Sequence, residues 1–142
     1  MADLETVCDG LAARLATITA LGSGRAHAEY PDAIVPPCAI VMPDDNDELA
    51  DYDQTLGGND TMWHLVVLLL VPLGSMRQAQ NDARAYLSNT GTRSLKAAID
   101  GDGTRGGAAH FSLVGNPRDY GRHTEGGVLC WGFVLPVDIW TQ

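Results

Sequence analysis

Apolar residues recur at two different spacings along the chain, and the spacing predicts which segments are helices and which are strands. Near the N-terminus, apolar side chains follow one another at three or four residues, the pattern of one buried helix face: Leu4, Val7, Cys8, Leu11, Leu15 and Ile18. Asp3 can cap the start of this predicted helix, and Gly22-Ser23-Gly24 is expected to end it.

Helical spacing returns twice in the second half of the chain. Ser75 is a favourable N-cap for a helix in which Met76, Ala79, Ala83, Tyr86 and Leu87 share one face. After a break at residues 89–91, a short helix is predicted over residues 94–100. The glycines at positions 101 and 103 are expected to end it.

Five segments carry the pattern of β-strands: residues 25–30, 38–42, 61–71, 109–114 and 128–140. The third is apolar at consecutive positions, so we expect it in the middle of a sheet with groups packed on both faces. Pro31 places the first strand at an edge, and Pro136 indicates a bulge or an edge position in the last. Residues 44–60 and 115–127 are predicted to be loops, and the first is expected to be mobile.

This order of helix, three strands, two helices and two strands predicts an α+β fold: a single mixed β-sheet of about five strands flanked by helices. With 142 residues, the chain is expected to form one domain spanning residues 1–142. A chain of this length can bury a normal hydrophobic core, so a disulfide or structural metal is not required.

The charge balance argues against tight binding to a nucleic acid. The chain has 18 Asp and Glu against 9 Lys and Arg, for a formal net charge of −9, and the cations are not clustered in the sequence. Affinity for a nucleic-acid backbone comes mainly from clustered cations, so we expect DNA to be repelled.

The cysteines and the apolar runs indicate where the protein is made. There are three cysteines, far apart and without a C-x-x-C pair, which indicates a reducing compartment. The N-terminus is acidic where a secretory signal would be basic. The longest apolar run, residues 65–71, is much shorter than the ~20 residues that span a bilayer. We therefore expect synthesis in a cytoplasm and no membrane partner.

Two local patterns match ligand-binding motifs only in part. Residues 101–106 match G-x-G-x-x-G, but they follow a predicted helix and precede a strand, the reverse of the dinucleotide-binding order. Asp44, Asn46 and Glu48 occupy the first, third and fifth positions of a calcium loop. Leu49 and Thr55 then stand where glycine and glutamate are required. Both segments are interpreted as loops.

No pattern of nucleophile and base or of zinc ligands is present. The sequence has no G-x-S-x-G elbow and no closely spaced Cys or His pair. His64 and His110 fall in predicted strands, where they are expected to be partly buried, and Trp63, Trp131 and Trp140 are expected in the core or at a subunit interface. The sequence predicts no enzymatic activity, no catalytic residue, no metal and no cofactor.

The order and spacing of several segments resemble one family, the tail terminator proteins of long-tailed, siphovirus-type bacteriophages, in particular those infecting actinobacteria. The resemblance covers nearly the whole chain and is carried by these segments: the helix at 4–21, the proline-bounded stretch 30–43, the acidic loop with Tyr52-Asp53, the strand 62–71, Ala83 to Ser88, the turn 94–99, Val114-Gly115-Asn116 and the C-terminal strand.

The resemblance implies a structural virion protein at the head-proximal end of the tail, assembled in the host cytoplasm. In that family, six copies close a ring on the tail tube, stop its polymerisation and face the head-completion or connector proteins. The implied partners are therefore further copies of the chain, the tail tube protein and a head-completion protein. DNA is expected to pass through the ring without specific binding.

Such a family has interfaces instead of a catalytic motif, so the candidate residues are surfaces. Six acidic residues are candidates for the ring lumen or for a docking loop: Asp44, Asp45, Asp47, Glu48, Asp51 and Asp53. Arg118, Arg122, His123 and Trp140 are candidates for contacts with a neighbouring subunit or partner. Strand 25–30 and the strand ending near Trp140 are candidate sheet edges for ring closure.

Two other interpretations stay open. One is another virion protein, either a neighbouring head–tail joining protein or a tail tube subunit. The other is a small ligand-binding or enzymatic α+β domain that uses the glycine-rich loop 101–107 and His110.

Overall fold

The computed structural model describes residues 3–46, 48–52, 60–101 and 111–141. These residues form three α-helices, one short 3-10 helix and seven strands. In chain order they are α1 (Leu4–Leu15), η1 (Thr19–Leu21), β1 (Ala26–His27), β2 (Cys38–Pro43), β3 (Ala50–Tyr52), β4 (Thr61–Pro72), α2 (Met76–Leu87), α3 (Leu95–Asp100), β5 (Phe111–Val114), β6 (Arg118–Glu125) and β7 (Val128–Thr141).

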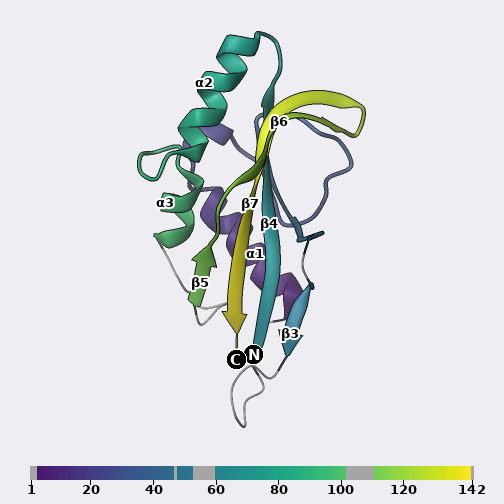
Figure 1. Cartoon of the computed structure of the whole chain (residues 1–142), viewed down its shortest axis with the longest axis vertical. Helices are drawn as coiled ribbons and strands as arrows, with labels where there is room; N and C mark the ends of the chain where they lie inside the picture. The colour runs from purple at the N-terminus through teal and green to yellow at the C-terminus, as the bar shows by residue number, and fades with distance from the viewer. Residues whose placement is uncertain (1–2, 47, 53–59, 102–110, 142) are drawn as a thin grey trace.

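Two long antiparallel strands, β4 and β7, form the middle of the sheet (Figure 1). Their register runs from Thr61 opposite Thr141 to Pro72 opposite Cys130. Strands β2 and β3 pair with the outer side of β4, and β5 and β6 pair with the outer side of β7. Strand β1 adds to β2 in parallel, which makes the sheet mixed.

One face of the sheet is covered by all three helices and holds the main core. Alternate residues of β4 and β7 point to this face, because side chains in a strand alternate between its two sides. They pack with the apolar faces of the helices: Leu65, Val67, Leu69, Val71, Phe133, Leu135, Val137 and Ile139 from the strands, and Val7, Leu11, Leu15, Ala79, Ala83, Leu95 and Ile99 from the helices.

The opposite face has a second, smaller core near the turn between β6 and β7. It contains Ile34, Cys38, Ile40, Leu68, Leu70 and Cys130. The segment before β2 supplies Ile34, and the Tyr30 hydroxyl donates to Glu125 Oε2 at 2.7 Å, which ties that segment to β6. The prediction that the third strand lies mid-sheet with groups on both faces is therefore confirmed.

Most of the predicted elements are present. Ser75 caps α2 as expected, and Ser94, the first residue of the predicted helix 94–100, is the N-cap of α3; each hydroxyl accepts from a backbone N–H three residues later. The first helix is shorter than predicted: α1 ends at Leu15, and a 3-10 turn keeps Ile18 and Leu21 buried. The first strand shrinks from residues 25–30 to Ala26–His27.

The prediction of about five strands was too low. Strand β3 lies inside the predicted acidic loop 44–60, and β6 lies inside the predicted loop 115–127. Both are edge strands that pair on one side only among the described residues. Pro136 is neither at the sheet edge nor in a bulge of the β4–β7 register. It lies opposite the gap between β5 and β6, and its carbonyl accepts from the backbone N–H of Gly115. Because no described strand pairs with β7 in this gap, the N–H that proline lacks is not needed there.

Candidate functional site

An ion pair joins the end of β2 to the start of β6 on the sheet face opposite the helices. Arg118 Nη2 donates to Asp44 Oδ1 at 2.7 Å, and the Asp44 side chain is only 10% exposed. The sequence placed Asp44 in a lumen or docking loop and Arg118 in a partner contact. In the structure, these two side chains pair with each other within one chain.

The environment of Asp44 favours its charged form. Burial raises the pKa of this carboxyl, but the backbone N–H of Asn46, the guanidinium of Arg118 and the nearby His64 lower it by more. The net effect is a lowered pKa. Asp44 is therefore a charged, largely buried group whose compensation comes from Arg118 and a local turn.

A histidine connects three neighbouring strands on the same face. His64 in β4 lies between two carboxylates: its Nε2 is 2.6 Å from Asp51 Oδ2 in β3, and its Nδ1 is 2.7 Å from Asp138 Oδ1 in β7. The His64 side chain is 9% exposed. A neutral imidazole has one N–H, so donation to both carboxylates requires the imidazolium form. We call this arrangement the His64 bridge.

The sequence missed the His64 bridge as a unit, although it placed His64 correctly in a strand. The sequence places Asp51 in the predicted loop 44–60, and no motif marks Asp138. The available signal is a single His or Asp within the apolar stretch of each strand: His64 follows Trp63 and precedes residues 65–71, and Asp138 lies between Val137 and Ile139. Register decides that they meet, since His64 lies directly opposite Asp138.

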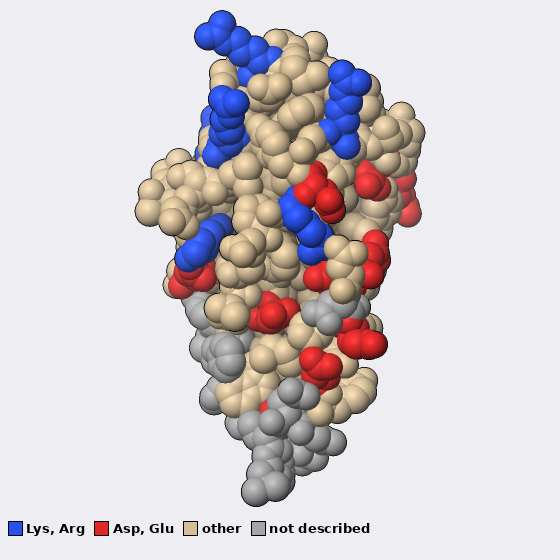
Figure 2. Space-filling view, viewed as in Figure 1, with Lys and Arg blue, Asp and Glu red and all other residues tan. Residues whose placement is uncertain are grey.

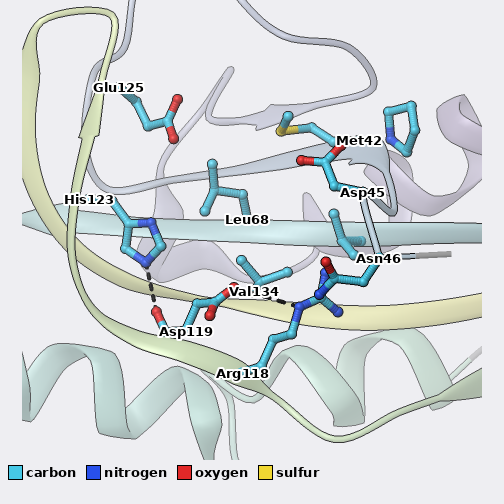
Figure 3. A pocket seen from close by; sticks show the side chains of 11 residues that line it. Met42, Asp45, Asn46, Leu68, Arg118, Asp119, His123, Glu125 and Val134 are labelled. Carbon is cyan, nitrogen blue, oxygen red and sulfur yellow. Dashed lines mark hydrogen bonds and ion pairs between the residues drawn. The ribbon is translucent and has the colours of Figure 1, made fainter.

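A cavity of about 220 Å³ lies beside the Asp44–Arg118 ion pair. Its apolar floor comes from the sheet and includes Met42, Leu68 and Val134, and its rim is charged (Figure 3). Arg118, Asp119, His123 and Glu125 of β6 line one side, and Asp45 and Asn46 line another. The rim carries both signs of charge, so it does not select for an anionic or a cationic ligand.

The remaining basic candidates of β6, His123 and Arg122, differ in whether the side chain already has a partner within the chain. His123 Nε2 lies 2.8 Å from the backbone oxygen of Asp119, a residue with a positive φ of 56°. Arg122 is exposed, lies opposite Trp131 in the β6–β7 hairpin, and forms no ion pair with a described residue. Of the three basic candidates, Arg122 is therefore the one whose charge is unused within the described part of the chain.

Trp140 is held inside its own subunit. Its Nε1 donates to Asp60 Oδ2 at 2.8 Å, and Asp60 is 1% exposed. The indole is only partly exposed and lies on β7 opposite Met62. Trp140 therefore has a role within the fold, whatever it contacts in an assembly.

Of the six acidic candidates, two have cationic partners and two are exposed. Asp44 pairs with Arg118 and Asp51 with His64, whereas Asp45 and Glu48 are exposed. Asp47 and Asp53 lie outside the described residues, as do Gly103, Gly106 and His110 of the glycine-rich alternative.

The side chains of opposite charge are separated along the molecule. Figure 2 shows most of the visible Lys and Arg side chains toward the end formed by α2 and the β6–β7 hairpin, and the Asp and Glu side chains toward the middle. Exposed arginines at this end include Arg77 and Arg84 of α2 and Arg122 of β6. None of the three forms an ion pair with a described residue.

The thiols in the structure are poorly suited to nucleophilic chemistry. Burial raises the pKa of Cys8 and of Cys38 to about 11 and raises that of Cys130 as well, and the thiolate is the reactive form. Within residues 3–46, 48–52, 60–101 and 111–141, no group of three or more His, Cys, Asp or Glu side chains could hold a metal ion.

Comparisons with protein families and with curated proteins give no match: no protein-family model matches the chain, and no curated protein is significantly similar to it. None of the helices in the described segments is both long and apolar enough to span a membrane.

Proposed function

We propose that this chain is a structural virion protein, a tail terminator that closes a ring of six copies on the tail tube. The observation that carries the proposal is a sheet with two unlike edges. Strands β1 and β3 form one edge and β5 and β6 the other, and no described strand pairs with the outer side of either.

A ring needs a heterologous interface, in which one surface of a subunit meets a different surface of the next. Two unlike edges meet this requirement, because unpaired backbone groups at an edge can extend a neighbour's sheet. The segment order that resembles the tail terminators supports the same assembly. In this ring the chain contacts the tail tube on one side and a head-completion protein on the other.

The charge of the chain suits a ring through which DNA moves. Six copies of a chain with net charge −9 place about −54 formal charges on one ring. Exposed carboxylates such as Asp45 and Glu48 that face the lumen would repel DNA within the ~8–10 Å range of electrostatic screening. DNA would then pass without being retained.

The test combines the mass of the protein in solution with electron microscopy after mixing with purified tail tubes. A tail terminator caps one end of each tube with a ring and stops further growth. A chain that adds along the whole tube is a tube subunit, and one that binds only the connector end of heads is another joining protein. Labelling the C-terminus of the chain in assembled particles distinguishes these positions.

A further inference from the structure

One end of the molecule carries an apolar patch bordered by arginines. In the β6–β7 hairpin, Tyr120 is 43% and Leu129 is 51% exposed, and the Tyr120 ring packs edge-on against Trp131 with centroids 5.4 Å apart. Arg122 lies opposite Trp131 in the same hairpin. We call these four residues the hairpin patch.

Helix α2 begins at the same end of the molecule as the hairpin (Figure 1). Its first turn exposes Met76 and Arg77, and Arg84 is exposed two turns later. Aromatic residues, Met and Arg are the types enriched in protein interfaces. In a chain with twice as many acids as cations, three arginines without a described carboxylate partner leave positive charge available for another molecule.

A hollow elsewhere on the chain has the complementary properties. It has a volume of about 420 Å³ and is lined by Leu4, Glu5, Cys8 and Asp9 of α1 together with Ala28 and Glu29. Its floor is apolar and its rim carries three exposed carboxylates, none of which forms an ion pair with a described residue. We call this hollow the α1 groove. The start of α1 lies toward the opposite end of the molecule from the start of α2 (Figure 1).

We propose that the hairpin patch of one copy docks in the α1 groove of the next copy, with Leu129 and Tyr120 against the groove floor and Arg122 facing its carboxylates. The contact rests on the proposed ring and names the surfaces that would close it. An apolar centre and a charged rim occur on both sides, with opposite signs. Because the two surfaces lie on different parts of one chain, the contact is heterologous, as ring closure requires.

The same properties favour a second copy over other occupants of the groove. A nucleic acid is repelled by the carboxylates of the groove rim. A hairpin patch that meets itself in a two-fold dimer would bring two surfaces that both carry Arg122 together and would supply no carboxylate from the α1 groove. The hairpin patch and the α1 groove are thus a matched pair carried by one chain, in which each subunit offers both halves.

The test uses two reciprocal charge reversals, Arg122→Glu and Glu5→Arg. Arg122→Glu places a carboxylate against the carboxylates of the groove rim, and Glu5→Arg places a second cation near Arg122, so self-association measured by analytical ultracentrifugation is expected to weaken by about tenfold or more in each variant. An equimolar mixture restores opposite charges at every contact if the subunits alternate. The mixture is therefore expected to regain assembly with equal numbers of the two variants, which native mass spectrometry measures.

Two control variants carry the same charge reversals at positions outside the hairpin patch and the α1 groove. Arg93→Glu lies in the α2–α3 connection and Asp32→Arg lies in the segment before β2; both residues are exposed and outside the two surfaces. Both variants are expected to assemble like the wild-type chain. Circular dichroism and thermal unfolding of each variant show that it is folded before assembly is compared.

The outcomes separate this contact from the proposed function. Wild-type chains that form rings unaffected by either reversal would overturn the contact and leave the ring standing. Rings that each single reversal weakens but the mixture does not restore would also overturn it. A wild-type chain that forms no ring, alone or on tail tubes, would remove the contact and the proposed function together.

Discussion

At the scale of single residues, Gly132 shows how closely the two central strands approach. A Cβ built at Gly132 would collide with the carbonyl oxygen of Leu69 in β4. Gly132 is buried, and a backbone on the neighbouring strand cannot move aside as a flexible side chain can. Glycine is therefore required here because no side chain fits between the two strands. Backbone conformation is not the reason, since the φ of Gly132 does not lie in the left-handed region.

We expect Gly132→Ala to lower the free energy of unfolding by at least about 3 kcal/mol, because either β4 or β7 must shift. Denaturant unfolding measures the change. The matched variant is Gly74→Ala, since a Cβ at Gly74 meets nothing within 4 Å. Gly74→Ala is expected to be neutral or slightly stabilising, and equal effects of the two substitutions would contradict the close approach of the strands.

Arg118→Met tests the ion pair with Asp44. The substitution leaves a carboxylate that is 10% exposed without its cation, so we expect a loss of about 1–3 kcal/mol at neutral pH. The lowered pKa of Asp44 fixes the sign of the pH dependence. Stability from a group with a lowered pKa is present above its ordinary pKa, here 3.8, and is lost as the pH falls further.

The difference in stability between wild type and Arg118→Met should therefore be full above about pH 5 and shrink as the pH falls below 3.8. Arg93→Met is the matched control, because Arg93 is 3.7 Å from Asp82 and 47% exposed. It is expected to change stability by less than about 0.5 kcal/mol. A difference that stays constant with pH would rule out Asp44 as the group involved.

Trp140, a candidate for a contact with a neighbouring subunit, also has a contact within its own subunit. Trp140→Ala would remove the N–H that Asp60 accepts, and Asp60 is 1% exposed. We therefore expect Trp140→Ala to destabilise the monomer by about 1–3 kcal/mol. Thermal unfolding of the monomer measures this loss, and an unchanged unfolding temperature would show that the Trp140–Asp60 hydrogen bond adds little to the stability of the fold.

At the scale of elements, the sequence predicts the parts of the fold that have their own pattern. Residues 65–71 and the alternate residues of β7 show their burial directly, and Ser75 marks the start of its helix. Strand β6 carries no such pattern: its sequence is Arg-Asp-Tyr-Gly-Arg-His-Thr-Glu. It is a strand because β7 offers it a partner, and only the three-dimensional register reveals this.

Strand β3 and the His64 bridge escape prediction for the same reason. Ala50–Tyr52 is too short for a periodic pattern, and its place in the sheet comes from pairing with residues 61–63 of β4. The contacts of His64 with Asp51 and Asp138 join positions 13 and 74 residues apart. Surface candidates from the sequence could be listed by charge, but which charges pair depends on these long-range contacts.

Asp51→Asn tests whether the His64 bridge holds β3 on the sheet. The amide cannot match the charged hydrogen bond to the imidazolium, so we expect faster hydrogen exchange at the backbone amides of Ala50–Tyr52. Exchange in β2 should stay unchanged, since β2 pairs with β4 independently of β3. Asp45→Asn, at an exposed residue outside the bridge, is the control; equal exchange in both variants would show that backbone pairing alone holds β3.

At the scale of the whole molecule, the acidic residues behind the net charge of −9 differ in how far their charge is compensated within the chain. The Asp44 side chain is only 10% exposed and pairs with Arg118, so its charge is largely compensated within the chain, whereas the Asp51 side chain is 42% exposed and Asp45 and Glu48 are exposed. In the proposed ring, Asp44 would therefore contribute less to the charge of the lumen than the exposed acidic candidates. Most of the visible Lys and Arg side chains lie toward the end formed by α2 and the β6–β7 hairpin, so positive charge is concentrated there (Figure 2).

Lysine at both Asp45 and Glu48 is expected to slow the exit of DNA from phage particles, because a lumen with added cations retains DNA. The rate of DNA ejection in vitro measures the effect, and it should depend on salt concentration. The neutral pair Asp45→Asn and Glu48→Gln should fall between this variant and wild type. Intact particles that eject DNA at the wild-type rate with both lysines would place these residues away from the lumen.

The His64 bridge has a consequence for the history of the sequence. Replacing His64 alone leaves two carboxylates facing each other across β4, and replacing one aspartate leaves the other as the sole counter-charge of a largely buried ring. Each single step is therefore disfavoured, while a joint change to apolar residues is not. Among descendants of a common ancestor, positions 51, 64 and 138 should be kept together or lost together.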